Sequence, residues 1–461
     1  FKFIEVRRKF RDSMVRLALM KKLASYPQVD PEILLTLSEL EDKELLRLIC
    51  RNPRAPPEAL KRLSECPDES VRTCVASNPN CPEETLKRLA NDPSSEVRKT
   101  VAGNPKMIRE VLEVLSKDPE PEVRAKVAEI AYPELLAKLS SDPSEKVRKN
   151  VASNPNTPFE VLIALSKDPS LEVRSAVASN PSAEGLLEVM VDDEELVRIA
   201  VASNPKIPLK VQEKLLKDSS RYVLEVLAKN PSVNPNVLYE LAKSSDDWVR
   251  RGVAVNPSAP EELLRGLAND GSEVVRIAVA SNPSAPKEVL ISLANSDSDR
   301  VKVAVASNRN APEEALRLLS KERNRDIILA LAENPKCPKD LLVTLASKED
   351  FEVKAAVARN PNAPSEVMDI LAKSGNVYLR VISASDPRTE IETLEELSRN
   401  GEQEVREALL FNPRLSPKIW GNLIENPTSL MKLMMALDPK TDPEILKKLA
   451  KEDDEEIRLA V

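Results

Sequence analysis

Residues 71–105 read VRTCVASNPNCPEETLKRLANDPSSEVRKTVAGNP, and this stretch contains one full copy of the pattern that decides the fold. The element Val-Ala-Ser-Asn-Pro at 75–79, or a near copy of it, recurs along the chain. Its asparagine is found at Asn52, Asn78, Asn104, Asn154, Asn180, Asn204, Asn230, Asn256, Asn282, Asn308, Asn334, Asn360 and Asn412.

The spacing of this element is almost constant. Tyr26, Ile130, Asp386 and Asp438 stand in the same register, which gives 17 positions and 16 intervals. Fourteen intervals are 26 residues long and two are 24. A fixed period of this length is typical of solenoids, in which each repeat packs on its neighbours. The sequence therefore predicts an array of about 17 repeats.

Each repeat is expected to hold two short helices and no strand. Pro82 opens the first helix, whose apolar stripe begins at Leu86. The Asp-Pro pair that begins at Asp92 ends that helix and caps the second, whose inner face carries Val97. The second helix ends at Asn104, because a residue before proline leaves the helical region. The repeated asparagine is expected to bond the backbone of adjacent turns.

The composition excludes several kinds of site. The 461 residues include no histidine, which excludes Ser-His-Asp and Cys-His catalysis and every metal site that needs imidazole. The eight glycines are too few for a repertoire of nucleotide-binding loops. With no nucleophile–base pair, phosphate loop or metal constellation, we expect no enzyme, no cofactor and no small-molecule substrate. No apolar run approaches the ~18 residues of a membrane span.

The N-terminal segment is basic although the whole chain is not. The formal net charge is −7, but residues 1–25 carry eight Lys and Arg against two acids. Apolar residues with helical spacing lie among these cations, so we predict a capping helix at 1–24 and a continuous repeat array at 25–461. A basic arm that touches nucleic acid, ribosome or membrane is the alternative. Because the chain begins at Phe1, we expect a further segment before it.

The pattern Val-Arg-x-x-Val-Ala-x-Asn-Pro, followed by Pro-x-x-Leu-x-x-Leu-Ala-x-Asp-Pro, resembles that of the leucine-rich repeat variant (LRV) family over roughly residues 45–460. The resemblance implies an all-α, right-handed α-solenoid in which an α-helix alternates with a shorter helix, often 3₁₀. The best-known type of member carries an iron–sulfur cluster in an N-terminal cysteine-rich segment. This sequence departs from the family there, so no cluster ligand is assigned to it.

Five cysteines, an odd number at irregular spacing, indicate a reducing compartment and hence the cytoplasm. Cys50, Cys66, Cys74 and Cys81 are separated by 15, 7 and 6 residues, unlike the short C-x₂-C spacing of ferredoxin-like sites. They and Cys337 stand at repeat positions that small residues can fill. We therefore expect them to be small substitutes in the packing and to bind no metal, with a metal or iron–sulfur site as the alternative.

A cation recurs six residues before the asparagine, on the second helix. Its longest unbroken run is Arg72, Arg98, Arg124, Arg148, Arg174 and Arg198; it continues at Arg250, Arg276, Lys302, Lys354, Arg380, Arg406, Lys432 and Arg458, with breaks at Leu224 and Ile328. If the second helices stack, these cations line up along one face as a ladder, which would bind an acidic or anionic partner. In the alternative they pair inside the molecule, within or between repeats, with Asp92, Asp118, Asp142, Asp168, Asp192, Asp218 and Asp270.

Residues 222–250 interrupt the repeat pattern with large side chains. Tyr222, Tyr239 and Trp248 are three of the seven Tyr and Trp residues in the chain. Exposed aromatic and arginine side chains are the favoured anchors of protein interfaces. Tyr222, Trp248 and Arg250 therefore join the six arginines from Arg72 to Arg198 as candidate partner-binding residues. A locally repacked core is the alternative.

These patterns predict a non-enzymatic interaction scaffold that binds a protein partner on an elongated superhelical surface. The alternative function is nucleic-acid or ribosome binding through the Arg/Lys ladder and the basic N-terminal helix, which a steep dependence on salt would reveal. Few glutamines among many Glu, Lys and Arg residues favour a thermophilic source.

Overall fold

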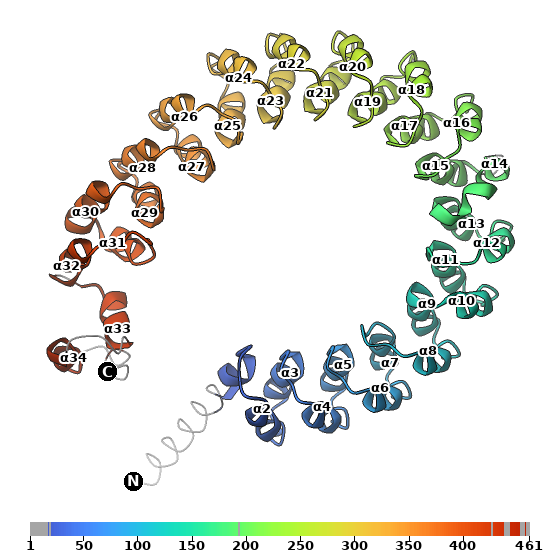
Figure 1. Ribbon diagram of the computed structural model, residues 1–461, viewed down its shortest axis with the longest axis horizontal. Coiled ribbons are helices and arrows are strands. Elements are labelled where there is room, and N and C mark those ends of the chain that lie inside the picture. The colour runs from blue at the N-terminus through green and yellow to red at the C-terminus, as the bar shows by residue number, and fades with distance from the viewer. Residues whose placement is uncertain are drawn as a thin grey trace, which may run out of the picture. The chain divides into compact units, whose positions relative to one another are not determined.

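The computed structural model describes residues 17, 20–191, 194–425, 427–437, 443–451 and 457, and every regular element in this part of the chain is a helix (Figure 1). The chain divides into two compact units, residues 1–237 and 238–461. In each unit the helices follow one another in pairs, two to a repeat. The predicted all-α solenoid of helical repeats is therefore confirmed.

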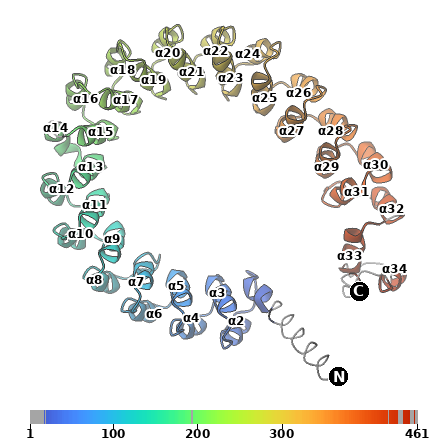
Figure 2. The same ribbon diagram turned by 180° about the vertical axis from the view of Figure 1, so that it is seen from behind.

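Within each unit the helices form two rows, which are visible from both sides in Figures 1 and 2. The first helices of the repeats are α2 (Pro31–Leu37), α4 (Pro57–Leu63), α6 (Glu83–Leu89), α8 (Arg109–Leu115), α10 (Pro133–Leu139), α12 (Phe159–Leu165), α14 (Leu187–Met190), α16 (Leu209–Leu215), α18 (Pro235–Leu241), α20 (Glu261–Leu267), α22 (Lys287–Ala294), α24 (Glu313–Leu319), α26 (Lys339–Ala346), α28 (Ser365–Ala372), α30 (Ile391–Asn400), α32 (Pro417–Glu425) and α34 (Pro443–Leu449).

The second helices make up the other row and pack on one another from repeat to repeat, as α11 does on α9 and α13. They are α3 (Lys43–Arg51), α5 (Glu69–Ser77), α7 (Ser95–Ala102), α9 (Pro121–Ile130), α11 (Glu145–Ser153), α13 (Leu171–Ser179), α15 (Glu195–Ser203), α17 (Arg221–Lys229), α19 (Asp247–Val255), α21 (Glu273–Ser281), α23 (Asp299–Ser307), α25 (Arg325–Glu333), α27 (Phe351–Arg359), α29 (Val377–Ser385), α31 (Gln403–Leu409) and α33 (Ser429–Leu437). None of the described helices has the length and apolarity needed to cross a membrane.

The first helices are mostly α-helical. The 3₁₀ conformation that the family resemblance implies occurs, in the described residues, at η1 (Pro181–Leu186). This segment lies in one of the two 24-residue repeats, where it is followed by the four-residue helix α14. The second helix of this repeat, α15, keeps nine residues, and the other 24-residue repeat has a regular first helix, α10, of seven residues.

The prolines and aspartates set the helix boundaries, with one difference from the expectation. Pro82 is the N-cap of α6, as predicted. The N-cap of α7 is Ser94, whose Oγ accepts from the Val97 amide, and not Asp92. Asp92 instead accepts from the Ser94 amide over 2.9 Å, because the intervening proline forms a turn before the helix begins.

The repeated asparagine links neighbouring repeats through the backbone. Nδ2 of Asn104 donates to the carbonyl oxygens of Ala76 and Asn78 over 2.6 and 3.0 Å, and its Oδ1 accepts from the Lys106 amide. Asn104 is 3% exposed. The side chain thus satisfies carbonyl groups at the end of the preceding second helix, which would otherwise be buried without a donor. The predicted bonding of the repeated asparagine to the backbone of adjacent turns is confirmed, and we call the series of these asparagines the asparagine ladder.

One repeat builds the same link from other residues. Asp386 replaces the asparagine and has no donor of its own. Nη1 of Arg388 donates to the Asn360 carbonyl over 2.8 Å and Nη2 to the Ala358 carbonyl over 2.6 Å. The Asp386 carboxylate accepts from Arg388 at Nε and Nη2. Arg388 therefore supplies the two donors that aspartate lacks.

The predicted capping helix at 1–24 lies largely outside the described residues. Its described residues, 17 and 20–24, are helical. Lys21 forms ion pairs with Asp42 at 3.2 Å and Glu44 at 2.5 Å, at the start of α3. The role of the segment as a cap stays a prediction.

Candidate functional site

The arginine ladder forms ion pairs between successive repeats. Nε and Nη2 of Arg72 donate to the two carboxylate oxygens of Asp92 over 2.7 and 3.0 Å. Its Nη1 donates to the carbonyl oxygens of Cys66 and Pro67. Because Asp92 belongs to the next repeat, one guanidinium ties the turn of its own repeat to the turn of the following one.

The same arrangement recurs in both units with Nε–Oδ2 distances of 2.6 or 2.7 Å. The further pairs are Arg98–Asp118, Arg124–Asp142, Arg148–Asp168 and Arg198–Asp218 in the first unit and Arg250–Asp270 in the second. Nη1 of Arg174 donates to the Asp168 and Pro169 carbonyls, whereas Asp192 lies outside the described residues. The arginines therefore form ion pairs with carboxylates of the next repeat. Where an aspartate stands six residues before the arginine, its backbone carbonyl oxygen accepts a hydrogen bond from Nη1.

These pairs are largely shielded from water. The side chains of Arg148 and Asp168 are 16% and 5% exposed. Burial is the largest single influence and raises the Asp168 pKa, but the bonds from Arg148 and from the Ser170 amide, together with the charges of Arg148 and Arg174, leave this pKa below its usual value. The bond to Asp168 raises the Arg148 pKa. Each such guanidinium already bonds a carboxylate of the protein itself, which competes with an outside ligand for the same donors. Partner binding by the ladder arginines stays a prediction.

The second unit carries variants of the pair. Lys302 replaces the arginine and bonds Glu322 over 2.8 Å. At Ile328 the cation is absent, and Lys348 stands where the carboxylate recurs in other repeats. Of these two variants, the first keeps the pair with another cation and acid, and the second lacks both the cation and the carboxylate.

The aromatic residues of the interrupted region lie at the surface. The side chains of Tyr222, Tyr239 and Trp248 are 53%, 37% and 41% exposed. The Arg221 guanidinium lies 4.9 Å from the centre of the Tyr222 ring, and that of Arg251 lies 5.2 Å from the Trp248 ring. These side chains are therefore not part of a repacked core, while their use in partner binding stays a prediction.

The cysteines are free thiols in different surroundings. Cys50, Cys74, Cys81 and Cys337 are buried, as expected for small substitutes in the packing, and Cys66 is half-buried. In the part of the chain that the structure describes, no three His, Cys, Asp or Glu side chains are grouped to hold a metal ion.

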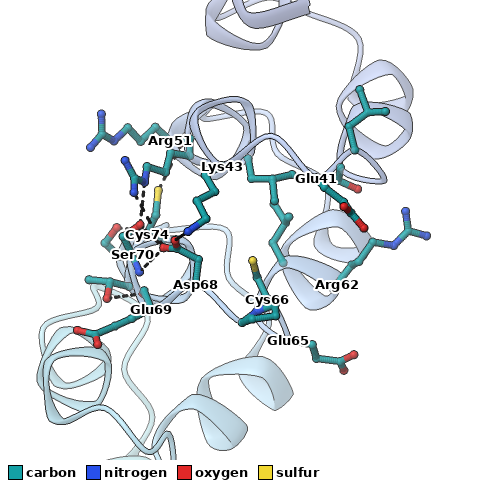
Figure 3. A pocket seen from close by; sticks show the side chains of 18 of the residues that line it. Glu41, Lys43, Arg51, Arg62, Glu65, Cys66, Asp68, Glu69, Ser70 and Cys74 are labelled. Atoms are coloured by element: carbon teal, nitrogen blue, oxygen red, sulfur yellow. Dashed lines mark hydrogen bonds and ion pairs between the residues drawn. The ribbon is translucent and has the colours of Figure 1, made fainter. Parts of the chain in front are cut away.

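Two of these cysteines line a pocket of about 1420 Å³ (Figure 3). Cys66 and Cys74 reach it from the turn before α5 and from α5 itself, and Lys43 and Arg51 reach it from α3. Lys43 pairs with Asp68 over 2.8 Å. The sequence places these cysteines in one segment, but only the packing of α3 against α5 brings Cys74 close to the cations.

We expect iodoacetamide to modify Cys74 before Cys50, Cys81 and Cys337. The neighbouring Cys50 thiol and the nearby Arg51 charge lower the Cys74 pKa, although burial opposes them, whereas the neighbouring Cys74 and burial raise the Cys50 pKa. Burial raises the pKa of Cys81 and of Cys337 to about 12. Because the thiolate is the reacting form, peptide mass spectrometry after timed alkylation at neutral pH should rank Cys74 first in this set. Equal rates for Cys74 and Cys81 would contradict the assignment.

Comparison with known protein families agrees with the repeat pattern. The family model described as leucine rich repeat variant matches residues 69–94, which contain α5 and α6. This segment matches one LRV repeat. The resemblance inferred from the sequence is therefore confirmed, and the matched repeat contains the first ladder pair, Arg72 with Asp92. No curated protein gives a significant match to the chain.

Solved structures similar to this chain are also helical repeat proteins. One is described as a leucine-rich repeat variant with a novel repetitive structural motif; it is 24% identical, covers 53% of this chain and 87% of its own, and has a TM-score of 0.34. A match to the Cnd3–Cnd2 condensin subcomplex of S. pombe has 15% identity and a TM-score of 0.26, and it covers 94% of this chain and 71% of the condensin chain. A match to a chain of the Kap95p–RanGDP complex has 12% identity and a TM-score of 0.26, and it covers 99% of this chain and 69% of the matched chain.

Proposed function

We propose that this chain is a non-enzymatic scaffold that binds a protein partner on the surface formed by its successive LRV-like repeats. The observation that supports the proposal most is that six arginines of the ladder each form an ion pair with an aspartate of the next repeat. These six cations are therefore paired inside the protein and are not left for a polyanion. The net charge of −7 also opposes nucleic-acid binding.

Exposed aromatic residues favour a protein partner. Trp248 is 41% exposed on α19 with Arg251 over its ring, and Tyr222 is 53% exposed on α17 with Arg221 over its ring. Tryptophan, tyrosine and arginine are the side chains that most often carry binding energy between proteins. Each of the two aromatic residues is therefore proposed as an anchor on its own unit. The lack of histidine in the chain supports a function without catalysis.

Affinity capture with the full chain as bait tests this function, using Trp248→Ala beside the unchanged bait. We expect one protein to be enriched by the unchanged chain and to be depleted about tenfold by Trp248→Ala, the range of an interface anchor. Phe411→Ala is the matched control, since Phe411 is an exposed aromatic residue of the same unit at 70% exposure. Capture should change little between about 50 and 200 mM salt.

The same experiment decides against the proposal if the captured material is RNA or ribosomes and is lost as salt rises. That result would support the alternative function, nucleic-acid or ribosome binding through the ladder and the basic N-terminal helix. A location in the cytoplasm and a thermophilic source stay predictions.

A further inference from the structure

Arg276 keeps the cation of the ladder where the carboxylate partner is missing. Its Nη1 donates to the carbonyl oxygens of Asp270 and Gly271 over 2.5 and 3.2 Å, as Nη1 of Arg250 does to those of Ser244 and Ser245. The arginine is thus held in the ladder conformation. Position 296, where the paired repeats have aspartate, is Ser296. Among the described residues no carboxylate forms an ion pair with Arg276, and its Nε and Nη2 are left for another acceptor.

Ser296 performs one of the two roles of the aspartate it replaces. In the preceding repeat, Oδ1 of Asp270 accepts from the Ser272 amide over 2.8 Å and also binds Arg250. Oγ of Ser296 accepts from the Ser298 amide over 3.3 Å, so the turn before the second helix is kept. A hydroxyl has no negative charge to offer a guanidinium. Ser296 therefore keeps the turn but provides no carboxylate for Arg276.

A pocket of about 620 Å³ lies at this position. Arg276 and Glu273 reach it from α21, Leu293 from α22, and Ser296 and Ser298 from the turn that follows α22. The pocket is large enough to admit a side chain from another protein.

We propose that Nε and Nη2 of Arg276 bind an aspartate or glutamate side chain of a protein partner, at the place that the molecule's own aspartate takes in the paired repeats. The inference deepens the proposed function, on which it rests, by naming the chemistry of one contact. The Arg250–Asp270 pair of the same unit gives the expected geometry, with distances of 2.7 and 2.9 Å. A planar carboxylate matches the two parallel donors of a guanidinium.

The acids around Arg276 do not exclude such a ligand. Glu273 accepts from Ser298 and from Arg300. In the preceding repeat Asp247 stands in the same place, accepts from Ser272 and coexists with the bound Asp270 carboxylate. Asp270 and Asp297 also line the pocket; Asp270 is bound by Arg250, and the exposed Asp297 stands where the preceding repeat has Gly271. The Arg276 site thus lacks the paired aspartate and has one additional acid, Asp297, in its lining. A phosphate would bring a second negative charge close to Glu273, so a singly charged carboxylate is the better fit.

Binding of a fluorescein-labelled peptide of consecutive glutamates to the full chain, followed by fluorescence anisotropy at low salt, tests the inference. Arg276→Gln removes the donors, and Ser296→Asp fills the site with an internal carboxylate. We expect either substitution to weaken binding about fivefold, the upper range for a partly exposed ion pair. Arg309→Gln, an exposed arginine outside the ladder, is the matched control and should leave the affinity within about twofold.

A second readout separates the pocket from general charge effects. Ser296→Asp is expected to raise the melting temperature because it completes the pair with Arg276, whereas Arg276→Gln should not raise it. Unchanged peptide affinity in both variants, or displacement of the peptide by inorganic phosphate at a lower concentration than by acetate, would overturn the inference. Loss of peptide binding in both variants without any captured protein partner would instead refute the proposed function and leave the carboxylate site standing.

Discussion

Replacing Asn282 with aspartate is expected to lower the free energy of unfolding by about 3 kcal/mol. Nδ2 of Asn282 donates to the Ala254 and Asn256 carbonyls over 2.7 and 3.0 Å, and Oδ1 accepts from the Ser284 amide. The residue is 2% exposed. Aspartate keeps the acceptor, but it loses both donors and sets a buried charge against two carbonyl oxygens.

The repeat with Asp386 and Arg388 provides the rescue for this variant. Because Arg388 supplies the donors that Asp386 lacks, adding Ser284→Arg to Asn282→Asp should recover about half of the lost stability. Chemical denaturation of both variants measures the loss and the recovery. Asn295→Asp, at an exposed helix end, is the control and should change stability by less than about 0.5 kcal/mol. A stable single variant would show that the asparagine ladder contributes little.

Replacing Asp270 with serine should cost about 2 kcal/mol, between the values for exposed and fully buried ion pairs. The side chains of Arg250 and Asp270 are 18% and 9% exposed and make two parallel bonds. Ser296 shows that serine keeps the turn at this place in the repeat. The loss therefore reports on the ion pair and not on the turn.

A double-mutant cycle isolates the pair. Arg250→Leu introduces the residue found at the same register at Leu224. The free energy of unfolding lost in the double variant should be about 1 kcal/mol smaller than the sum of the losses in the two single variants. Asp297→Ser, an exposed acid of the neighbouring turn, is the control. Additive losses would mean that Arg250 and Asp270 act independently.

The pair also gives stability a dependence on pH. The bond from Arg250 lowers the Asp270 pKa below 3.8 in the folded protein, although burial opposes this shift. The contribution of Asp270 is therefore present above pH 3.8 and is lost as the pH falls through the lower folded value. Asp270→Ser should narrow the stability difference between neutral pH and pH 3, which denaturation curves at the two values would measure.

The sequence predicted the fold through local signals that repeat. The 26-residue period, Pro82 at the start of α6 and the buried Leu86 and Val97 were all readable, because caps and apolar stripes depend on neighbours within one turn. The N-cap of α7 was misplaced by two residues, since Asp92 and Ser94 are both good caps and the turn between them chose Ser94. The composition alone excluded histidine chemistry, because the chain has no imidazole to supply it.

By itself, then, the sequence determined that this protein is an array of helix pairs joined by a recurring asparagine and carrying a recurring cation. Only the tertiary structure decided which carboxylate each cation meets. Arg98 has Asp92 six residues before it and Asp118 twenty after it, and it takes the carbonyl of the first and the carboxylate of the second. Helix stacking between repeats sets that choice, because it fixes which side chain reaches the guanidinium plane. The same stacking shows that Arg276 keeps its place in the ladder without the carboxylate that its neighbours have.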